Sequence, residues 1–202
     1  MRRYDVRVSA EEPELSPRLP LRLWWRATDP PAVAAVLERL GLRPSDGSVP
    51  LGAIVLSVVA ADGDDLDRLE VCDAVHGPRS GTASDGPRLA ALGWATVDAE
   101  RLAAALGKPL IDDAHGDPAL GATGYGIASA SLPLVLLEPA TEGRIAAALA
   151  RLGEGPVALY LAGVTLGPDD DATPVGSTGT GRKGRLLRSP RPSGPFIVAL
   201  ES

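Results

Sequence analysis

Aromatic residues, histidine and cysteine are all scarce in this chain of 202 residues. It holds one cysteine and two histidines, and aromatic residues make up only 3% of it. A single cysteine, Cys72, excludes an internal disulfide, and nothing in the sequence resembles a thiolate zinc site. Hydrophobic residues make up 45% of the chain. We therefore expect a core built mainly from leucine, valine and alanine.

Long apolar runs and a surplus of positive charge are also absent. No run approaches the roughly 18 apolar residues that a membrane-spanning helix needs. The N-terminal sequence MRRYDVRVSAEEPELSP lacks the apolar centre of a signal peptide. The net charge of −6 and the pI near 5.0 argue against nucleic acid or an anionic membrane as a partner. We expect a soluble, cytoplasmic protein.

What the chain does contain is a series of short apolar segments between turn-forming residues. Residues 19–27 are typical of a strand. Asp29 follows as a helix cap, and the proline after it is tolerated in a first helical turn. Apolar residues then recur at helical spacing up to Gly41, where a C-terminal glycine is expected. We predict one strand over residues 49–60 and another over 69–75.

A second strand–helix unit has the same layout. Residues 89–97 predict a strand, Asp98 a helix cap and Gly107 the end of the helix. The polar sequence IDDAHGDPALGATG, residues 111–124, predicts a loop, and a strand is expected over residues 125–130.

The similar layouts of RATDPPAVAAVLERLG and WATVDAERLAAALG indicate a weak internal repeat. A segment of small, polar and turn-forming residues lies between them and is typical of a linker. We therefore predict an N-terminal extension (1–18), a first module (19–76), a linker (77–88) and a second module (89–202).

Residues 132–161, LPLVLLEPATEGRIAAALARLGEGPVALYL, combine an apolar strand, an alanine-rich helix, a Gly-Glu-Gly turn and a second apolar strand. A glycine-rich, basic loop follows over residues 167–195, and a closing strand over 195–200. A structureless segment of that length is unusual inside a compact domain. The loop is therefore either a functional lid or partly mobile.

This stretch resembles the vicinal oxygen chelate superfamily, the fold of glyoxalase I, bleomycin-resistance proteins, extradiol dioxygenases and methylmalonyl-CoA epimerase. ATDPPAVAAVLERLGLRP also resembles the first strand–helix unit of these proteins, and GPFIVAL their closing strand. The resemblance implies an α+β fold in which paired βαβββ modules form mixed sheets around an open cup. It also implies a homodimer.

The metal ligands of that superfamily do not carry over. Members with a metal hold it with His and Glu or Gln on the strands that line the cup. The matching positions here are Arg22 or Ala91, Val135, Val157 or Ala158, and Ala199. None of these side chains is such a ligand. The resemblance therefore implies a cup with no metal in the usual place, and we expect no cofactor.

The densest cluster of possible metal ligands is Asp112, Asp113, His115 and Asp117. On an extended segment, the last three would point to one side, which a metal could use. The alternative is an ordinary solvated turn, since such Asp/Gly/Pro clusters commonly form one.

Two further features offer acid–base or nucleophilic chemistry. Cys72 and His76, near Glu70, could form an activated thiolate pair, or Cys72 could be a small buried residue. Glu138 could be a general base with a raised pKa beside a cavity, or it could cap or salt-bridge the following helix.

The glycine-rich sequence at residues 179–184 matches the GxGxxG spacing of dinucleotide-binding loops, and residues 176–182 nearly match a phosphate-binding loop. Both motifs require a strand before the loop and a helix after it. The neighbouring sequence is rich in aspartate, arginine and proline, so we exclude both functions.

A basic segment and two tryptophans remain as ligand-binding candidates. The basic residues could hold a carboxylate or phosphate, or they could be solvated or paired with the aspartate runs. They are Arg182, Lys183, Arg185, Arg188 and Arg191. Trp25 and Trp94 lie shortly before the helix caps of the two repeats. They could stack on a flat or apolar ligand or pack in the core.

We therefore predict a protein similar to glyoxalase and bleomycin-resistance proteins that binds a small organic molecule without a metal. Its ligand would lie in an apolar cup with tryptophan in the wall and Arg182, Lys183 and Arg185 at the rim. One alternative is an isomerase or lyase of the same fold, using Glu138 or a metal at Asp113 and His115. Another is a non-catalytic structural or interaction protein whose cup is filled with side chains.

Overall fold

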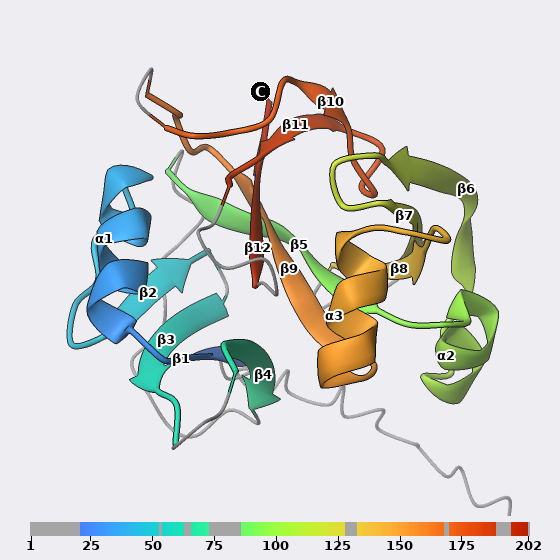
Figure 1. Cartoon of the computed structure of the whole chain (residues 1–202), viewed down its shortest axis with the longest axis horizontal. Coiled ribbons are helices and arrows are strands. Elements are labelled where there is room, and N and C mark those ends of the chain that lie inside the picture. Colours follow the sequence, from blue (N-terminus) through green and yellow to red (C-terminus); the bar gives the residue numbers. More distant parts are fainter. Residues whose placement is uncertain are drawn as a thin grey trace, which may run out of the picture.

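The computed structural model describes residues 21–52, 54–62, 66–72, 86–127, 133–167, 170–188 and 195–201. The described part forms two sheets, of four and eight strands, together with three helices (Figure 1). None of the described helices is long and apolar enough to cross a membrane.

Residues 21–72 build the smaller sheet, whose strand order is β2-β3-β1-β4. Strand β1 pairs in parallel with β3 and antiparallel with β4, and β2 pairs antiparallel with β3. Helix α1 connects β1 to β2. The bounds are β1 Leu21–Ala27, α1 Pro30–Arg39, β2 Ser48–Leu51, β3 Ile54–Ala60 and β4 Arg68–Cys72.

The helix predicted after Asp29 is confirmed. Asp29 is the N-cap, and its side chain accepts a hydrogen bond from the backbone N–H of Ala32 at 3.1 Å. Gly41 follows the last turn with φ +76°, a left-handed conformation that glycine adopts without strain. Val33 and Leu37 of this helix are buried. Local capping chemistry and apolar spacing therefore define this helix.

The single strand predicted over residues 49–60 is wrong. Strand β2 ends at Leu51 and β3 begins at Ile54, and the two pair antiparallel. Gly52 lies between them with φ +73°, which lets the chain reverse in a tight turn. A continuous apolar run does not distinguish one long buried strand from two short ones, because both bury most of their side chains.

Residues 86–201 build the larger sheet, of order β10-β11-β12-β9-β5-β8-β7-β6. In one half, β5 pairs in parallel with β8, and β7 and β6 follow antiparallel. In the other, β9 pairs in parallel with β12, and β11 and β10 follow antiparallel. The halves meet where β5 and β9 pair antiparallel. The bounds are β5 Arg88–Ala95, α2 Ala99–Ala105, β6 Leu110–Asp117, β7 Ala122–Ile127, β8 Leu134–Pro139, α3 Arg144–Leu152, β9 Gly155–Ala162, β10 Gly176–Ser177, β11 Lys183–Leu186 and β12 Phe196–Leu200.

The predicted α+β class, with βαβββ units in mixed sheets around a cup, is confirmed. The eight-stranded sheet curls, so that its outer strands β6 and β10 come into contact (Figure 1). The first half has α2 after its first strand, whereas the described residues between β9 and β10 contain no helix.

Both halves of the curled sheet come from residues after 86, and residues 21–72 form their own sheet. The division into modules at 19–76 and 89–202 stays a prediction. The predicted extension 1–18 and residues 77–85 of the predicted linker lie outside the described residues.

The polar loop predicted over residues 111–124 is also wrong. Its sequence forms β6 and the start of β7, with their connecting turn. Strand β6 is the last strand of the curled sheet, and β7 is its one partner among the described strands. An edge strand keeps much of its surface in solvent and tolerates charged side chains, so its sequence lacks the apolar pattern of a buried strand.

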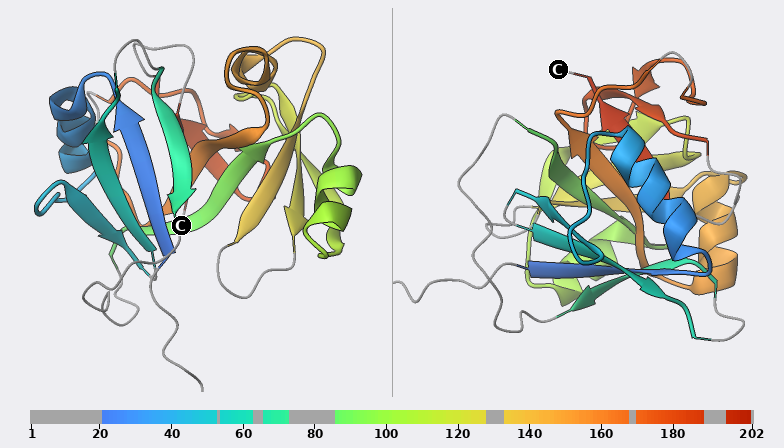
Figure 2. Two further views of the ribbon diagram at one scale, coloured as in Figure 1. Left: turned by 90° about the horizontal axis from the view of Figure 1, so that it is seen from below. Right: turned by 90° about the vertical axis from the view of Figure 1, so that its left-hand side faces the viewer.

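Strand β9 lies between two parts of the core. Leu159 and Leu161 pack in a cluster with the four-stranded sheet and α1, whereas Ala158 and Tyr160 belong to the cluster inside the curled sheet. Because both faces are covered, the strand is apolar almost throughout. Figure 2, left, shows the four-stranded sheet with α1 on one side of β5 and β9, and β6 to β8 on the other.

Helices α2 and α3 cover different faces of the curled sheet. Ile145 and Ala148 of α3 belong to the interior cluster. Ala99 and Ala103 of α2 pack on Leu136 of β8 in a separate cluster. The inside of the sheet is therefore partly filled by α3 and by its own side chains, and the remaining space is small.

Candidate functional site

A pocket of about 290 Å³ lies inside the curled sheet, between β6 and the turn that connects β10 to β11. Its apolar lining includes Ala91 of β5, Val135 of β8 and Leu200 of β12. Of the described residues that line it, four have polar side chains: Asp113, His115, Thr180 and Arg182. The pocket therefore combines an apolar wall with groups of both charges.

Asp113 and His115 come from β6. They are two residues apart on a strand, so their side chains lie on the same face, and both line the pocket. The part of the cluster prediction that places these two on one side is thus met. The imidazole of His115 lies against Gly181: a Cβ built on that glycine would be 2.6 Å from Nε2.

Thr180 and Arg182 come from the turn at residues 178–182, which we call the 178–182 turn. Both the backbone N–H and Oγ1 of Thr178 donate to the Arg182 carbonyl oxygen, at 3.0 and 2.8 Å. The N–H of Gly181 donates to the Thr178 carbonyl at 2.9 Å. Nη2 of Arg182 donates to the Glu201 carbonyl at 2.7 Å. These bonds place the arginine at the edge of the pocket.

Asp117, the last residue of β6, lies beneath this turn with 1% of its surface exposed. Its Oδ2 accepts hydrogen bonds from the Tyr160 hydroxyl at 2.9 Å and the Gly179 N–H at 3.0 Å. Its Oδ1 accepts one from the Leu120 N–H at 3.1 Å. Burial raises the pKa of Tyr160 well above its ordinary value, and the Asp117 carboxylate adds to that effect.

Glu138 lies at the end of β8, and no part of it lines the pocket. Its Oε1 accepts a hydrogen bond from the Ala99 N–H at 2.6 Å, at the first residue of α2. A carboxylate at a helix N-terminus is stabilised by the helix dipole. Burial raises the pKa of Tyr125, and the adjacent Glu138 carboxylate raises it further. The structure therefore shows a capping contact for Glu138, to α2 rather than to the following helix.

The two tryptophans predicted to bind a ligand pack elsewhere. Trp25 is 5% exposed and belongs to the core between the two sheets. Trp94 packs against the cluster under α2. The indole Nε1 of each is buried and has no hydrogen-bond partner among the described residues. Neither side chain lines the pocket.

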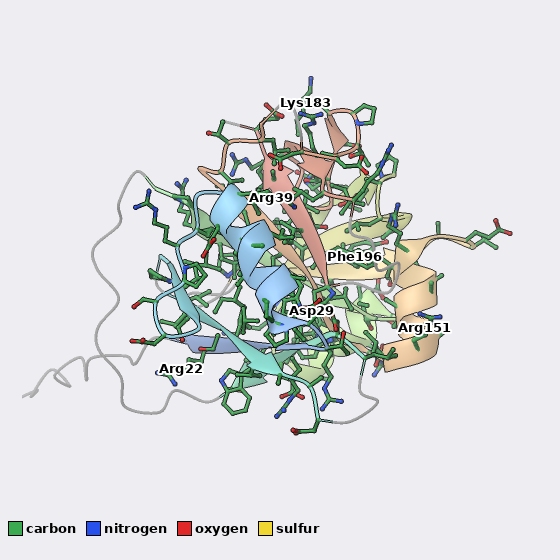
Figure 3. All side chains as sticks on the ribbon, turned by 60° about the vertical axis from the view of Figure 1, so that its left-hand side comes forward. Arg22, Asp29, Arg39, Arg151, Lys183 and Phe196 are labelled. Carbon is green, nitrogen blue, oxygen red and sulfur yellow. The ribbon has the colours of Figure 1, made fainter. Side chains whose placement is uncertain are left out.

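Arg182 alone of the three predicted rim residues lines the pocket. Lys183 is exposed and lies at the outer edge of the molecule (Figure 3). Nε of Arg185 donates to the Thr173 carbonyl at 3.0 Å. Arg188 pairs with Asp171 at 3.2 Å, as the sequence alternative of pairing with the aspartate run anticipated. Arg191 lies outside the described residues.

Of the thiolate pair predicted from Cys72 and His76, His76 lies outside the described residues. Glu70 accepts hydrogen bonds from Arg26 and Arg68, each at 2.8 Å. The hydrogen bond from Arg26 holds the pKa of Glu70 below its ordinary value. Glu70 therefore belongs to a surface ion-pair network on the smaller sheet.

The residues at the superfamily's metal positions do not fit a metal ion. Ala91 and Val135 line the pocket with methyl groups, and Val157, Ala158 and Ala199 are buried apolar side chains. Arg22 lies on the smaller sheet. The described residues contain no group of three or more His, Cys, Asp or Glu that could hold a metal.

Sequence reasoning missed Thr180 and the role of Asp117 beneath the turn. Thr180 lies in the glycine-rich segment that was excluded as a dinucleotide-binding or phosphate-binding loop, and that exclusion did not address a turn that carries polar side chains to a pocket. The alternation of polar residues along β6 was the available signal for the pocket, because it places Asp113 and His115 on one face if the segment is extended.

No protein-family model matches this chain, and no curated protein matches it. Solved structures with a similar fold include methylmalonyl-CoA epimerase from Mycobacterium tuberculosis. It is 17% identical, with a TM-score of 0.41, over 55% of this chain and 87% of its own. Hypothetical protein BH1468 from Bacillus halodurans C-125 is 16% identical, with a TM-score of 0.44, over 57% of this chain and 94% of its own.

A mutant of 4-hydroxymandelate synthase from Streptomyces coelicolor is 17% identical, with a TM-score of 0.40, over 90% of this chain and 69% of its own. These structural neighbours are proteins of the vicinal oxygen chelate fold, which the sequence resembles. The similarity is one of fold.

Proposed function

We propose that this protein binds a small organic anion in the pocket of the curled sheet, without a metal ion. The observation that carries the proposal is the convergence of Arg182, Thr180 and His115 on a pocket with an apolar wall. A guanidinium group and a hydroxyl are suited to a carboxylate or phosphate oxygen. The apolar wall would contact the organic part of the ligand, as in most small-molecule sites.

The size and charge of the pocket limit which ligands it can bind. A volume of about 290 Å³ is at the lower end of the range for ligand pockets, so the ligand is small. Asp113 lines the same pocket, and its carboxylate repels a second negative charge but accepts a hydrogen bond from a hydroxyl or amine. A monoanion that also carries a hydrogen-bond donor fits best.

Binding without a metal is supported by the chemistry of the lining. Among the described residues that line the pocket, Asp113 and His115 are the two of the usual metal-binding types, and zinc sites in enzymes generally use three protein ligands. Elemental analysis of the purified, dialysed protein tests this point. A stoichiometric, tightly bound divalent metal would contradict the proposal.

Arg182→Ala tests the anion site, with Lys183→Ala as a control that removes the same charge from the next residue. The probes are butyrate, 2-hydroxybutyrate and the neutral butyramide. The readout is the imidazole proton resonance of His115, one of two histidines in the chain, assigned with a His115→Asn variant. Charged hydrogen bonds contribute about 1.5–3 kcal/mol, so affinity for both acids falls at least about tenfold in Arg182→Ala.

Lys183→Ala should retain affinity within about twofold, because Lys183 does not line the pocket and its exposed charge is screened by salt. Butyramide should bind more weakly than butyrate to the unchanged protein. If neither acid perturbs the His115 resonance, or if both variants lose affinity equally, the pocket is not the proposed anion site.

A divergent isomerase or lyase is a second candidate, because Asp113 and His115 place two proton-transfer groups in the same pocket. Incubation of a bound carboxylic acid in D₂O separates the two functions. Deuterium incorporation next to the carboxylate, lost in His115→Asn, would support catalysis. An unlabelled ligand would support binding alone.

A further inference from the structure

The curled sheet contains one buried carboxylate, that of Asp117, among its described residues. A buried charge is costly unless it is fully hydrogen-bonded. Here both oxygens have donors: Leu120 on Oδ1, and Tyr160 and Gly179 on Oδ2. The donors come from the β6–β7 turn, from β9 in the other half of the sheet, and from the 178–182 turn. One side chain thus joins the two outer edges of the curled sheet.

The 178–182 turn lies directly on β6 and β7. A Cβ on Gly124 of β7 would be 2.4 Å from the Cα and carbonyl oxygen of Gly179, closer than real atoms approach. Gly181 adopts φ +77° and contacts the ring of His115. These glycines let the backbone of the turn approach β6 and β7 closely, and the N–H of Gly179 then reaches Asp117.

The turn also divides the interior of the sheet. On one side of it lies the ligand pocket, lined by Gly179, Thr180 and Arg182. On the other lies a second pocket of about 260 Å³, lined by Asp117, Thr178, Leu186 and Val198 among others. Displacement of the turn would join the two spaces and remove Arg182 and Thr180 from the wall of the first.

We propose that Asp117 is a positioning residue: it holds the 178–182 turn across the curled sheet and thereby sets the size and charge of the ligand pocket. The consequence for ligands rests on the proposed function, because Arg182 and Thr180 are the groups that the turn carries. Asp117 itself does not line that pocket and would not touch the ligand.

Asp117→Asn tests the proposal, because an amide has one acceptor oxygen where the carboxylate has two. The single amide oxygen of the variant can accept either the hydrogen bond from the Leu120 N–H or those from the Tyr160 hydroxyl and the Gly179 N–H, but not all three. Hydrogen exchange in the peptide covering the turn should accelerate at least about tenfold, since exchange reports local opening. The His115 resonance should shift as Gly181 moves away, whereas exchange in β5 and β9 should not change. Butyrate affinity should fall about as far as in Arg182→Ala.

Asp171→Asn is the matched control, the same chemical change at an exposed carboxylate on the preceding loop. It should alter neither the exchange of the turn nor the His115 resonance. Gly124→Ala is a second variant, because it leaves Asp117 intact but pushes the turn outward. It should reproduce both changes and weaken butyrate binding. If it leaves the His115 resonance and butyrate affinity unchanged, the turn does not set the ligand pocket and the proposal fails, whether or not Asp117→Asn folds.

A folded Asp117→Asn with unchanged exchange in the turn and an unchanged His115 resonance would overturn the positioning role. That result leaves the proposed function standing if butyrate still binds the unchanged protein. Conversely, failure of the unchanged protein to bind butyrate would count against the proposed function, while the exchange and resonance measurements still decide the role of Asp117.

Discussion

Glu154, in the Gly-Glu-Gly turn before β9, joins the two halves of the curled sheet through one carboxylate. It accepts hydrogen bonds from the Thr96 hydroxyl and the Val97 N–H, and both of its oxygens accept from Nη2 of Arg101. The bond from Thr96 is the largest of several effects that lower the pKa of Glu154 to about 2. The turn is thereby fastened to the loop between β5 and α2.

This carboxylate should make stability depend on pH in a defined window. Its folded-state pKa is lower than its unfolded value of 4.5, so its contribution is complete above about pH 4.5 and is lost as pH falls toward 2. Glu154→Gln should destabilise the protein by about 1 kcal/mol at pH 7, since partial exposure reduces the full effect of the shift.

The measurement is urea unfolding of both proteins between pH 7 and pH 2.5. The difference between them should shrink as the pH falls below 4.5. Glu38→Gln, at an exposed position on α1, should show no such trend. A difference that is constant with pH would show that Glu154 acts in some other way than as a hydrogen-bonded carboxylate.

At the scale of elements, β6 differs from the loop that its sequence predicts, and the predicted loop over residues 167–195 contains the strands β10 and β11. The sequence of β6 is polar, and residues 167–195 are rich in glycine, both of which are typical of loops. In the structure, β6 is an edge strand and the 178–182 turn lies across it, and together they provide the four polar side chains among the described residues that line the pocket. The segments with the weakest sequence pattern therefore form the candidate site.

Glu138 and α2 offer a test that separates capping from chemistry. Glu138→Ala removes the acceptor for the Ala99 N–H at the start of the helix. Loss of such a contact should cost about 1 kcal/mol in thermal or urea unfolding. Butyrate affinity should be unchanged, because Glu138 lies outside the pocket.

Glu142→Ala, at an exposed position before α3, is the control and should leave stability within about 0.5 kcal/mol. Glu138→Ala could instead keep full stability and abolish either ligand binding or the incorporation of deuterium from D₂O into a bound carboxylic acid. That result would support the catalytic prediction for Glu138 over the capping role.

At the scale of the whole molecule, the two sheets share one core. Leu23 and Leu56 of the smaller sheet belong to the same buried cluster as Leu92 and Leu159 of the larger one. Burial of a leucine contributes about 1.5–3 kcal/mol, so the shared cluster should make the sheets unfold together. Far-UV circular dichroism and tryptophan fluorescence should then report coincident unfolding transitions.

Leu159→Ala tests this coupling, because Leu159 is fully buried in the shared cluster. A large-to-small change at such a site should cost about 2–5 kcal/mol, with the two transitions still coincident. Leu106→Ala, at a side chain that is 48% exposed, should cost much less. Separate transitions would show that the two sheets are independent units.

The sequence by itself determined the helix caps, the apolar strands and the absence of metal-binding side chains at the superfamily's metal positions. Asp29 and Asp98 cap their helices through hydrogen bonds to residues three positions away, and such local chemistry can be read from a short window. The apolar character of Ala91 and Val135 likewise follows from residue type alone. These properties need no knowledge of which strands pair.

Only the tertiary structure decided where the candidate site lies. Asp113 and His115 meet Arg182 because β6 and β10 are opposite edges of one sheet that curls until they touch. That curl depends on pairings between distant strands, and on contacts such as Asp117 with Gly179, which no local pattern encodes. Trp25 packs in the core, and Trp94 packs, partly buried, against the cluster under α2, for the same reason: the strand pairing, not the spacing from a helix cap, sets which face of a strand is covered.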